Sequence, residues 1–352
     1  MLAILGAILV ADAIFRVYAV RIAQPIFETP PPFHVERHPV DPAAEVLRIP
    51  VGPDRTLAAA LFFPETSPDG RAARGVVVFC PELGSDRWSA PAYCRGLLDL
   101  GYLVLAFDFR GQGESDPGPV GHRPHHWLTE VEVTDVMAAV ERTARDERLA
   151  GLPLTLFGVS RGAGAALVAA SRLSAGRACC VVADGAYSAR TMMMFFFNRW
   201  AGLYVPDWML KLLPRWHVAS TLRIVEWCSA RRRPTPFAHV EPALRKLKRV
   251  PVFMISGERD SYVLPRFTLR LQRITRQPKE RAWVVPGAKH NGNRRADPVE
   301  YDRRLIEFIE AAGGSREPTH DMHRRTPSPT APETRRPATA AMVATNSTSH
   351  SR

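Results

Sequence analysis

The sequence predicts an α/β fold in which a mostly parallel sheet of about eight strands is covered by helices on both faces. Two observations lead to this prediction. Between residues 45 and 312, short apolar runs alternate with longer helical segments, which is the pattern of consecutive β-α units. Runs such as 75–80 and 102–107 are apolar throughout, as is typical of strands buried on both faces of a parallel sheet.

Each element follows from its own residues. The strands are expected at 45–51, 56–63, 75–80, 102–107, 154–157, 178–183, 250–255 and 282–285. The helices between them are expected at 91–100, 127–145, 160–171, 265–274 and 299–312. Gly101 directly follows the first of these helices, and a glycine in that place favours a helix end.

The first twenty residues are predominantly apolar. A helix of twenty residues spans roughly 30 Å, about the thickness of a bilayer core. Asp12 and Arg16 interrupt the stretch, and their spacing of four would let them pair on a helix. We predict that residues 1–24 form a hydrophobic helix that anchors the protein to a membrane. A signal peptide is one alternative, which the lack of Lys or Arg before the apolar stretch disfavours. A helix packed on the domain is the other.

Arginines follow the apolar stretch at positions 16, 21 and 37. Positive residues beside a membrane span favour the cytoplasmic side, so the remaining chain is expected in the cytoplasm. Residues 25–44 include three consecutive prolines and predict a stiff linker. Residues 313–352 are rich in Pro, Thr, Ser and Arg and poor in large apolar side chains. That composition predicts a disordered basic tail.

The formal net charge of +12 is concentrated in residues 186–249, which hold twelve Lys or Arg and three acids. A basic segment favours anionic substrates or an anionic lipid surface. No nucleic-acid-binding motif accompanies it, so nucleic acid is not an expected partner. The five cysteines are odd in number and none are spaced as zinc ligands. We therefore expect buried thiols and no metal.

A serine flanked by glycines follows the predicted strand at 154–157. Residues 158–162 read Gly-Val-Ser-Arg-Gly and precede an Ala-rich helix. Strand, sharp turn and helix form a nucleophile elbow, in which the glycines permit close backbone approach. The helix N-terminus also favours negative charge at Ser160. We predict that Ser160 is a catalytic nucleophile rather than an ordinary helix-capping serine.

Over roughly residues 46–312 the chain resembles the α/β-hydrolase superfamily. The loop at 108–115, Asp-Phe-Arg-Gly-Gln-Gly-Glu-Ser, is similar to the Asp-x-Arg-Gly-x-Gly-x-Ser loop of its members. The motifs resemble the acylglycerol-lipase and serine-aminopeptidase branches. This resemblance implies the α/β-hydrolase fold with a helical cap. The loop itself is expected to be structural, with Arg110 paired to backbone or to acids.

The resemblance also implies a catalytic triad. The family's base follows the last strand, where this chain has His290. The family's acid follows the preceding strand, and Asp260 occupies that position. The order of serine, acid and histidine along the chain agrees with the family. Asp184, one strand earlier, is the alternative acid, and Glu258 is expected to be a solvated turn carboxylate.

The tetrahedral intermediate of acyl transfer needs two backbone N–H donors. The N–H of Arg161, directly after the nucleophile, is expected to be one. The other should come from the loop after the strand at 75–80, where many relatives have His-Gly and this chain has Cys80-Pro81. Proline has no N–H, so the donor is expected to be Glu82 or Leu83.

Residues 186–249 interrupt the alternation of strands and helices. They hold four of the seven tryptophans and the run Met-Met-Met-Phe-Phe-Phe at 192–197. Because Met and aromatic side chains make adaptable apolar walls, we predict a helical cap that lines an acyl or aromatic pocket. A helical pair that buries these side chains in the core is the alternative.

Together these features predict a serine hydrolase that cleaves a small-molecule or lipid carboxylic ester through an acyl-enzyme, without a cofactor. The triad chemistry does not distinguish an ester from an amide, and the choice of branch rests on analogy. Two other functions stay open. One is acyl transfer to an acceptor other than water. The other is membrane-associated binding or scaffolding on an inactive hydrolase fold, which Cys80-Pro81 and the basic cap favour.

Overall fold

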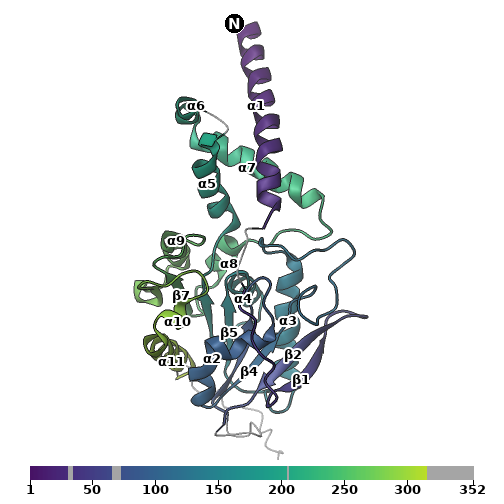
Figure 1. The fold of residues 1–352 in the computed structure, drawn as a ribbon, viewed down its shortest axis with the longest axis vertical. Coiled ribbons are helices and arrows are strands. Elements are labelled where there is room, and N and C mark those ends of the chain that lie inside the picture. Colours follow the sequence, from purple (N-terminus) through teal and green to yellow (C-terminus); the bar gives the residue numbers. More distant parts are fainter. Residues whose placement is uncertain (31–34, 66–72, 204–205, 315–352) are drawn as a thin grey trace, which may run out of the picture. The chain divides into compact units, whose positions relative to one another are not determined.

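The computed structural model describes residues 1–30, 35–65, 73–203 and 206–314 and contains one eight-stranded sheet (Figure 1). In chain order the strands are β1 (Glu45–Pro50), β2 (Thr56–Phe62), β3 (Gly75–Cys80), β4 (Tyr102–Phe107), β5 (Leu154–Val159), β6 (Cys180–Asp184), β7 (Val252–Gly257) and β8 (Ala282–Val285). Across the sheet their order is β1-β2-β4-β3-β5-β6-β7-β8. Strand β2 is antiparallel to both neighbours and the other pairs are parallel. This confirms the predicted α/β-hydrolase fold.

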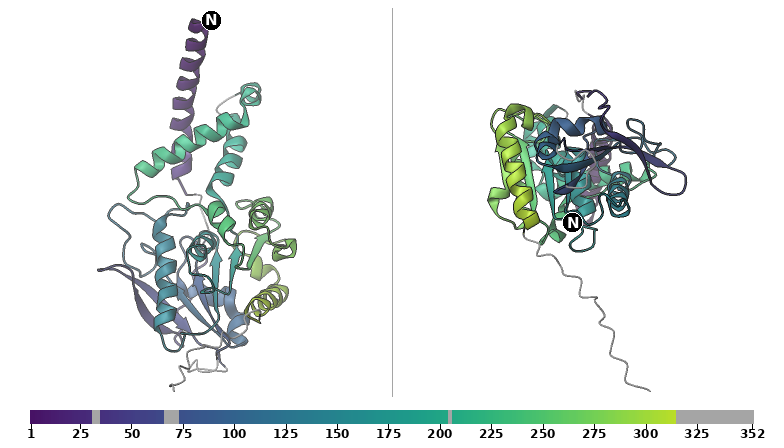
Figure 2. Two further views of the ribbon diagram at one scale, coloured as in Figure 1. Left: turned by 180° about the vertical axis from the view of Figure 1, so that it is seen from behind. Right: turned by 90° about the horizontal axis from the view of Figure 1, so that it is seen from below.

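Helices cover both faces of the sheet (Figures 1 and 2). In β3, Val76 and Val78 point into a core shared with α3 (Glu130–Arg145), α4 (Arg161–Ala170), α8 (Val240–Lys246) and α9 (Pro265–Thr275). Val77 and Phe79 point into the opposite core with α2 (Ala90–Asp99) and α11 (Pro298–Gly314). Successive strand residues alternate between faces, so two buried faces require the continuous apolar runs seen in the sequence.

Helix α3 begins at Glu130, three residues later than predicted. The Thr129 side chain accepts a hydrogen bond from the backbone N–H of Val131, and the Glu132 carboxylate accepts from the N–H and hydroxyl of Thr129. This capping box satisfies the first amide groups of the helix and fixes its start. Trp127 therefore lies in the preceding loop.

The N-terminal helix α1 (Leu2–Glu28) extends beyond the predicted residue 24 and continues through Pro25. The Arg16 guanidinium pairs with Asp12 at 2.7 Å, as their spacing predicts. Helix α1 is long and apolar enough to cross a membrane, a property that core helices and signal sequences can share. Its side chains are nevertheless mostly uncovered, including Leu5 and Leu9.

Helices α5 (Ala189–Trp200), α6 (Asp207–Leu212) and α7 (Arg215–Arg231), together with the short turn η2 (Ala201–Leu203), form what we call the cap. Helix α1 packs against α7, which runs across it (Figure 1). Helix α8 lies inside the range 186–249 predicted as cap, yet its Ala243 and Leu244 belong to the core beneath the sheet. The chain thus returns to the main body before β7.

The remaining elements are short. They are η1 (Arg87–Ser89), η3 (Lys279–Arg281) and α10 (Asn293–Ala296). The predicted linker at 25–44 is shortened by the last turn of α1, and its residues 31–34 lie outside the described residues. The predicted disordered tail lies almost wholly in residues 315–352, which are also outside them.

Candidate active site

The backbone at Ser160 adopts a conformation that L-residues rarely occupy, with φ of 53° and ψ of −115°. Its neighbours explain how the turn fits. A Cβ added to Gly158 would lie 2.3 Å from the carbonyl oxygen of Gly162, and one added to Gly162 would lie 2.1 Å from that of Cys80. Strain of this kind is typical of functional sites, and here it places Ser160 at the end of β5 and the start of α4.

Ser160, His290 and Asp260 come together although they are far apart in the sequence. The Oγ atom of Ser160 lies 3.0 Å from Nε2 of His290, and Nδ1 of His290 lies 2.7 Å from Oδ2 of Asp260. Because a carboxylate only accepts hydrogen bonds, Nδ1 carries the proton and Nε2 accepts from the serine hydroxyl. Asp260 is also held by the N–H groups of Tyr262 and Val263, at 2.9 and 2.8 Å.

The alternative acid, Asp184, makes different contacts. Its carboxylate accepts from Nδ2 of Asn293 at 2.5 Å and from the hydroxyl of Tyr301 at 2.7 Å. Burial raises the pKa of Asp184 to about 6, although both hydrogen bonds oppose the shift. The backbone carbonyl of Asp184 accepts the N–H of Ser160 at 2.7 Å. Asp184 therefore supports the turn at Ser160. Glu258 accepts from the N–H of Gly287 at 2.8 Å on the protein surface.

The predicted oxyanion loop lies beside the start of α4. Besides its approach to Cys80, a Cβ on Gly162 would lie 2.5 Å from the carbonyl oxygen of Pro81. Helix α4 begins at Arg161. The loop that leads to Glu82 and Leu83 therefore starts next to the N-terminus of this helix, where the Arg161 amide lies. That these N–H groups bind an oxyanion stays a prediction.

The Arg161 side chain is buried away from solvent. One of its terminal nitrogens donates to the Glu132 carboxylate and to the carbonyl oxygen of His125, both at 3.0 Å. The guanidinium also lies 5.2 Å from the ring centroid of Phe109. This anchoring joins α4 to α3 and so fixes the first backbone amides of α4.

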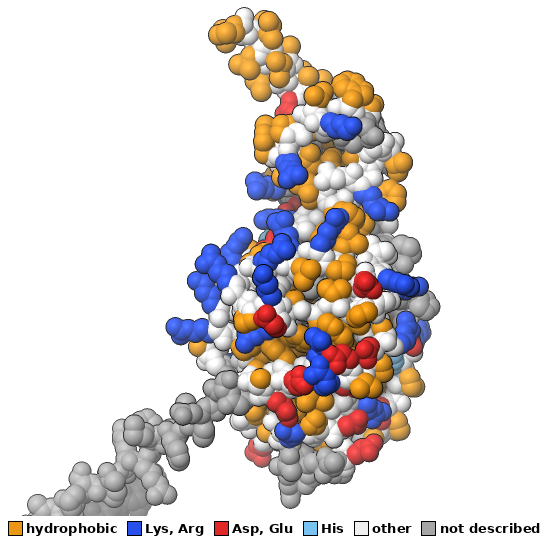
Figure 3. Space-filling view, turned by 90° about the vertical axis from the view of Figure 1, so that its left-hand side faces the viewer, with side chains coloured by type: hydrophobic (Ala, Val, Ile, Leu, Met, Phe, Trp, Pro, Cys, Tyr) orange, Lys and Arg blue, Asp and Glu red, His pale blue; other side chains and the backbone are white. Residues whose placement is uncertain are grey.

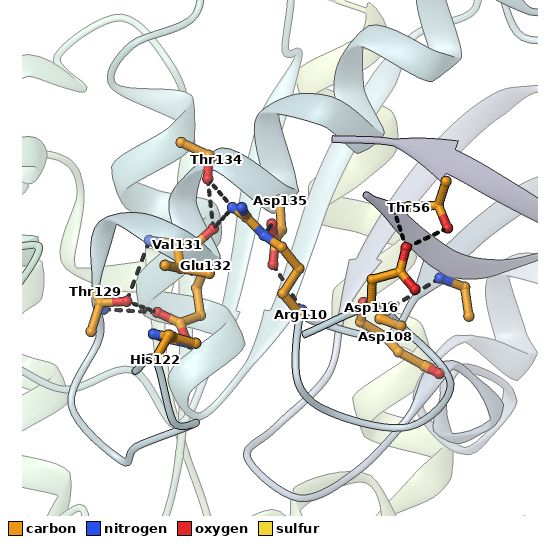
Figure 4. Close-up of polar contacts among 12 residues, drawn as sticks. Thr56, Asp108, Arg110, Asp116, His122, Thr129, Val131, Glu132, Thr134 and Asp135 are labelled. Carbon is orange, nitrogen blue, oxygen red and sulfur yellow. Dashed lines mark hydrogen bonds and ion pairs between the residues drawn. The ribbon is translucent and has the colours of Figure 1, made fainter. Parts of the chain in front are cut away.

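The loop at 108–115 stabilises the same end of the sheet (Figure 4). Arg110 donates to Asp135 at 2.5 Å and to the carbonyl of Val131 at 3.0 Å. The Asp108 carboxylate accepts the Arg87 guanidinium at 2.5 Å and the N–H of Glu114 at 2.8 Å. These contacts agree with the structural role expected from the sequence.

Glu82 also places a carboxyl group in the site, which the sequence did not suggest. The carboxyl is buried, and the Tyr93 hydroxyl, with its single proton, lies within hydrogen-bond distance of it at 3.3 Å and of the carbonyl oxygen of Asn291 at 3.2 Å. Asn291 directly follows His290 in the chain. Burial raises the pKa of Glu82 to about 7, while Tyr93 and the charge of His290 lower it.

Tyr262 is a second residue that sequence reasoning missed. Its ring packs edge-on against the His290 imidazole, with centroids 5.4 Å apart, and lies 6.1 Å from the ring of Phe196 in the cap. Its position two residues after the predicted acid was the available signal. Within the described ranges, no group of three His, Cys, Asp or Glu residues is arranged to hold a metal.

Comparisons with known proteins agree with this fold. Residues 71–292, more than half of the chain, match the family model described as serine aminopeptidase, S33. An esterase of Pyrococcus furiosus superposes with a TM-score of 0.54 at 21% identity, covering 82% of this chain and 98% of its own. Est1E of Butyrivibrio proteoclasticus, solved with ferulic acid, gives 0.53 at 15% identity, with coverages of 75% and 99%. No curated protein sequence matches the chain.

Proposed function

Since the chain belongs to the serine aminopeptidase S33 family and is a hydrolase of the α/β-hydrolase superfamily, we propose that it cleaves carboxylic esters with Ser160, His290 and Asp260. The two hydrogen bonds that join these side chains, 3.0 and 2.7 Å long, are the observation that carries the proposal. Each group is within the reach needed for proton transfer.

In the proposed reaction, Nε2 of His290 takes the proton of the Ser160 hydroxyl while the oxygen attacks the ester carbonyl carbon. The oxyanion that forms accepts the N–H of Arg161 and that of Glu82 or Leu83. The intermediate collapses to an acyl-enzyme, and the imidazolium gives its proton to the leaving alcohol. Water deprotonated by His290 then releases the acid, while Asp260 holds the imidazole in its tautomer.

The surroundings of His290 favour an ester over an aminopeptidase substrate. A cavity with Tyr262 in its wall is lined mostly by aliphatic and aromatic side chains, and among the described residues no Asp or Glu lines it. The free α-ammonium group of a peptide would need an acidic partner when taken out of water. A neutral apolar ester needs none.

The proposal is tested with a fluorophosphonate probe and a p-nitrophenyl ester. Wild-type protein should be labelled and should hydrolyse the ester, whereas Ser160→Ala should do neither. A folded wild-type protein that resists the probe would refute the esterase and support the alternative, a binding or scaffolding protein. Product analysis with an added alcohol or amine distinguishes hydrolysis from acyl transfer.

We also propose that α1 attaches the enzyme to the cytoplasmic face of a membrane. Large apolar residues of α1 such as Ile4, Leu5, Ile8 and Leu9 are more than half exposed. Figure 3 shows hydrophobic side chains over this end of the molecule, with Lys and Arg between it and the main body. Uncovered apolar surface of this extent is typical of a membrane or protein contact, and basic residues favour an anionic lipid surface.

A further inference from the structure

A cavity of about 570 Å³ lies between α1, the cap and the loop before α3. Its volume is within the range of about 300–1,000 Å³ typical of small-molecule sites. Its walls are almost entirely apolar, with Phe196 and Phe197 from α5, and Leu222 and Val225 from α7. Such walls suit a hydrocarbon rather than a polar ligand.

Helix α1 supplies eight of the twenty residues that line this cavity. Phe15, Ile22 and Ile26 are separated by seven and four residues, so they lie on one face of the helix. Asp12 and Arg16, seven residues before the lining residues Ala19 and Ala23, lie at the edge of this face and contact α7. The apolar sequence of α1 therefore serves a wall of the cavity as well as the exposed surface.

The second half of α1 is held by hydrogen bonds at two places. Near its middle, the Arg16 guanidinium donates to the hydroxyls of Ser220 at 2.8 Å and Thr221 at 3.3 Å in α7. At its end, Nε1 of Trp127 donates to the carbonyl oxygen of Phe27 at 2.8 Å. These contacts satisfy polar groups of the helix and hold α1 as part of the fold.

Tyr262 separates the cavity from the proposed triad and contacts both. Tyr262 lines the cavity, its ring packs against the His290 imidazole, and its N–H donates to Asp260 at 2.9 Å. In the proposed complex, a hydrocarbon chain passes the Tyr262 ring and lies between α1 and the cap, with its ester group at Ser160.

From this arrangement we propose that α1 and the cap together form the pocket for the hydrocarbon chain of a lipid ester, with α1 as a specificity-determining wall. The inference rests on the esterase function proposed above. Each methylene that enters the pocket should raise kcat/KM roughly fourfold, the equivalent of ~0.8 kcal/mol of apolar burial, until the pocket is full.

The test compares Ile22→Trp, which fills the cavity, with Val17→Trp. Val17 is on the same helix, is 55% exposed and does not line the cavity. In detergent, kcat/KM is measured for p-nitrophenyl esters from acetate to dodecanoate. The dodecanoate-to-acetate ratio should fall at least tenfold in Ile22→Trp and stay near the wild-type value in Val17→Trp. Equal ratios in the two variants would overturn the pocket.

A parallel series of alkyl acetates tells which side of the ester enters. A length dependence confined to the acyl series places the acyl chain in the pocket, and one confined to the alkyl series places the alcohol there. Flat profiles in both series contradict the proposal. If Ile22→Trp fails to fold, Ile22→Ala replaces it, and the preferred chain should then become longer rather than shorter.

Binding of dodecanoate, measured by calorimetry in a Ser160→Ala background, separates this inference from the esterase proposal. Adding Ile22→Trp should weaken binding at least tenfold, and adding Val17→Trp should not. If dodecanoate binding follows this pattern but the wild-type protein is not labelled by the fluorophosphonate probe, the pocket proposal stands and the esterase proposal is refuted. If the protein hydrolyses esters but Ile22→Trp leaves dodecanoate binding unchanged, the pocket proposal is refuted and the esterase proposal stands.

Discussion

The backbone N–H of Ser160 donates a 2.7 Å hydrogen bond to the carbonyl oxygen of Asp184. Asp184 therefore contacts the nucleophile through its main chain, while its carboxylate is occupied by Tyr301 and Asn293. Asp260, in contrast, meets the imidazole with its carboxylate. The two carboxylates at neighbouring strand ends thus have separate tasks, which mutation can distinguish.

Asp260→Asn is expected to lower kcat by about 10⁴-fold, because an amide no longer fixes the correct tautomer of His290. Asp184→Asn should lower it less than tenfold, since an amide oxygen can still accept from Tyr301. Both variants are assayed with a short p-nitrophenyl ester after their folding is checked by circular dichroism. The reverse order of effects would make Asp184 the functional acid.

Ser160→Ala should lower kcat by roughly 10⁶-fold, as removal of a triad nucleophile does elsewhere. The small residual rate reflects binding and oxyanion stabilisation alone. Steady-state kinetics measure the loss, and the melting temperature should stay close to that of the wild type. A residual rate above about 10⁻² of the wild-type rate would mean that another group performs the attack.

Gly162→Ala should abolish activity or folding, because its Cβ would lie 2.1 Å from the carbonyl oxygen of Cys80 and 2.5 Å from that of Pro81. Gly164→Ala is the matched control in the same helix. Its Cβ would meet only the side chains of Leu128 and Val240, at 3.4 Å. Thermal unfolding and ester hydrolysis should separate the two variants. Similar behaviour of both would show that the oxyanion loop can move away.

The Glu82 carboxyl should make stability depend on pH. Its folded pKa of about 7 lies above the ordinary value of 4.5, so the folded state binds the extra proton. The stability it contributes is complete below about pH 4.5 and is lost as the pH rises through 7. The free energy of unfolding of Glu82→Gln minus that of wild type should therefore be up to about 3 kcal/mol larger at pH 8 than at pH 4.

Urea unfolding at pH 4, 6 and 8 measures this gain. Titrating groups that do not interact with Glu82 contribute equally in both proteins and cancel in the difference. A difference between the two proteins that is the same at every pH would show that the Glu82 carboxyl titrates normally.

Leu5→Asp/Leu9→Asp should weaken binding to vesicles of phosphatidylcholine and phosphatidylglycerol at least tenfold, because a charge in the bilayer core costs roughly 2.5–3.5 kcal/mol. Val120→Asp/Val299→Asp adds the same charge at exposed apolar positions of the main body, outside α1 and the cap. Co-sedimentation measures binding. Equal loss in both double variants would attribute it to net charge rather than to α1.

The sequence predicted the sheet better than the surroundings of the site. Strands β3, β4 and β8 lie at their predicted residues because a short apolar run bounded by turn residues can form few structures other than a buried strand. The end of α1 was placed too early because His125 and Trp127, which donate hydrogen bonds to the carbonyl oxygens of its last turn, lie about a hundred residues further along the chain. No local pattern contains that information.

The meeting of Ser160, His290 and Asp260 could be predicted from the family resemblance, because each follows a strand, and strand ends meet at one edge of a parallel sheet. The burial of the Glu82 carboxyl could not be predicted, because it depends on packing by Tyr93 and on the loop that contains Asn291. Likewise, the apolar pattern of α1 led to the prediction of a membrane anchor. The same pattern also fits a wall of the cavity, and only the packing against α5 and α7 distinguishes the two roles.

The last turn of α1 is tied to the loop before α3 by His125 and Trp127, which contact the carbonyl oxygens of Glu28 and Phe27 at 2.8 Å. With the first turns of α1 embedded in lipid, this rigid joint would keep the catalytic body at a constant height and tilt above the membrane. Ser160 would then reach only those ester bonds that sit at a matching depth. The depth of the scissile bond in the membrane would then discriminate between lipids before the pocket discriminates by the length of the hydrocarbon chain.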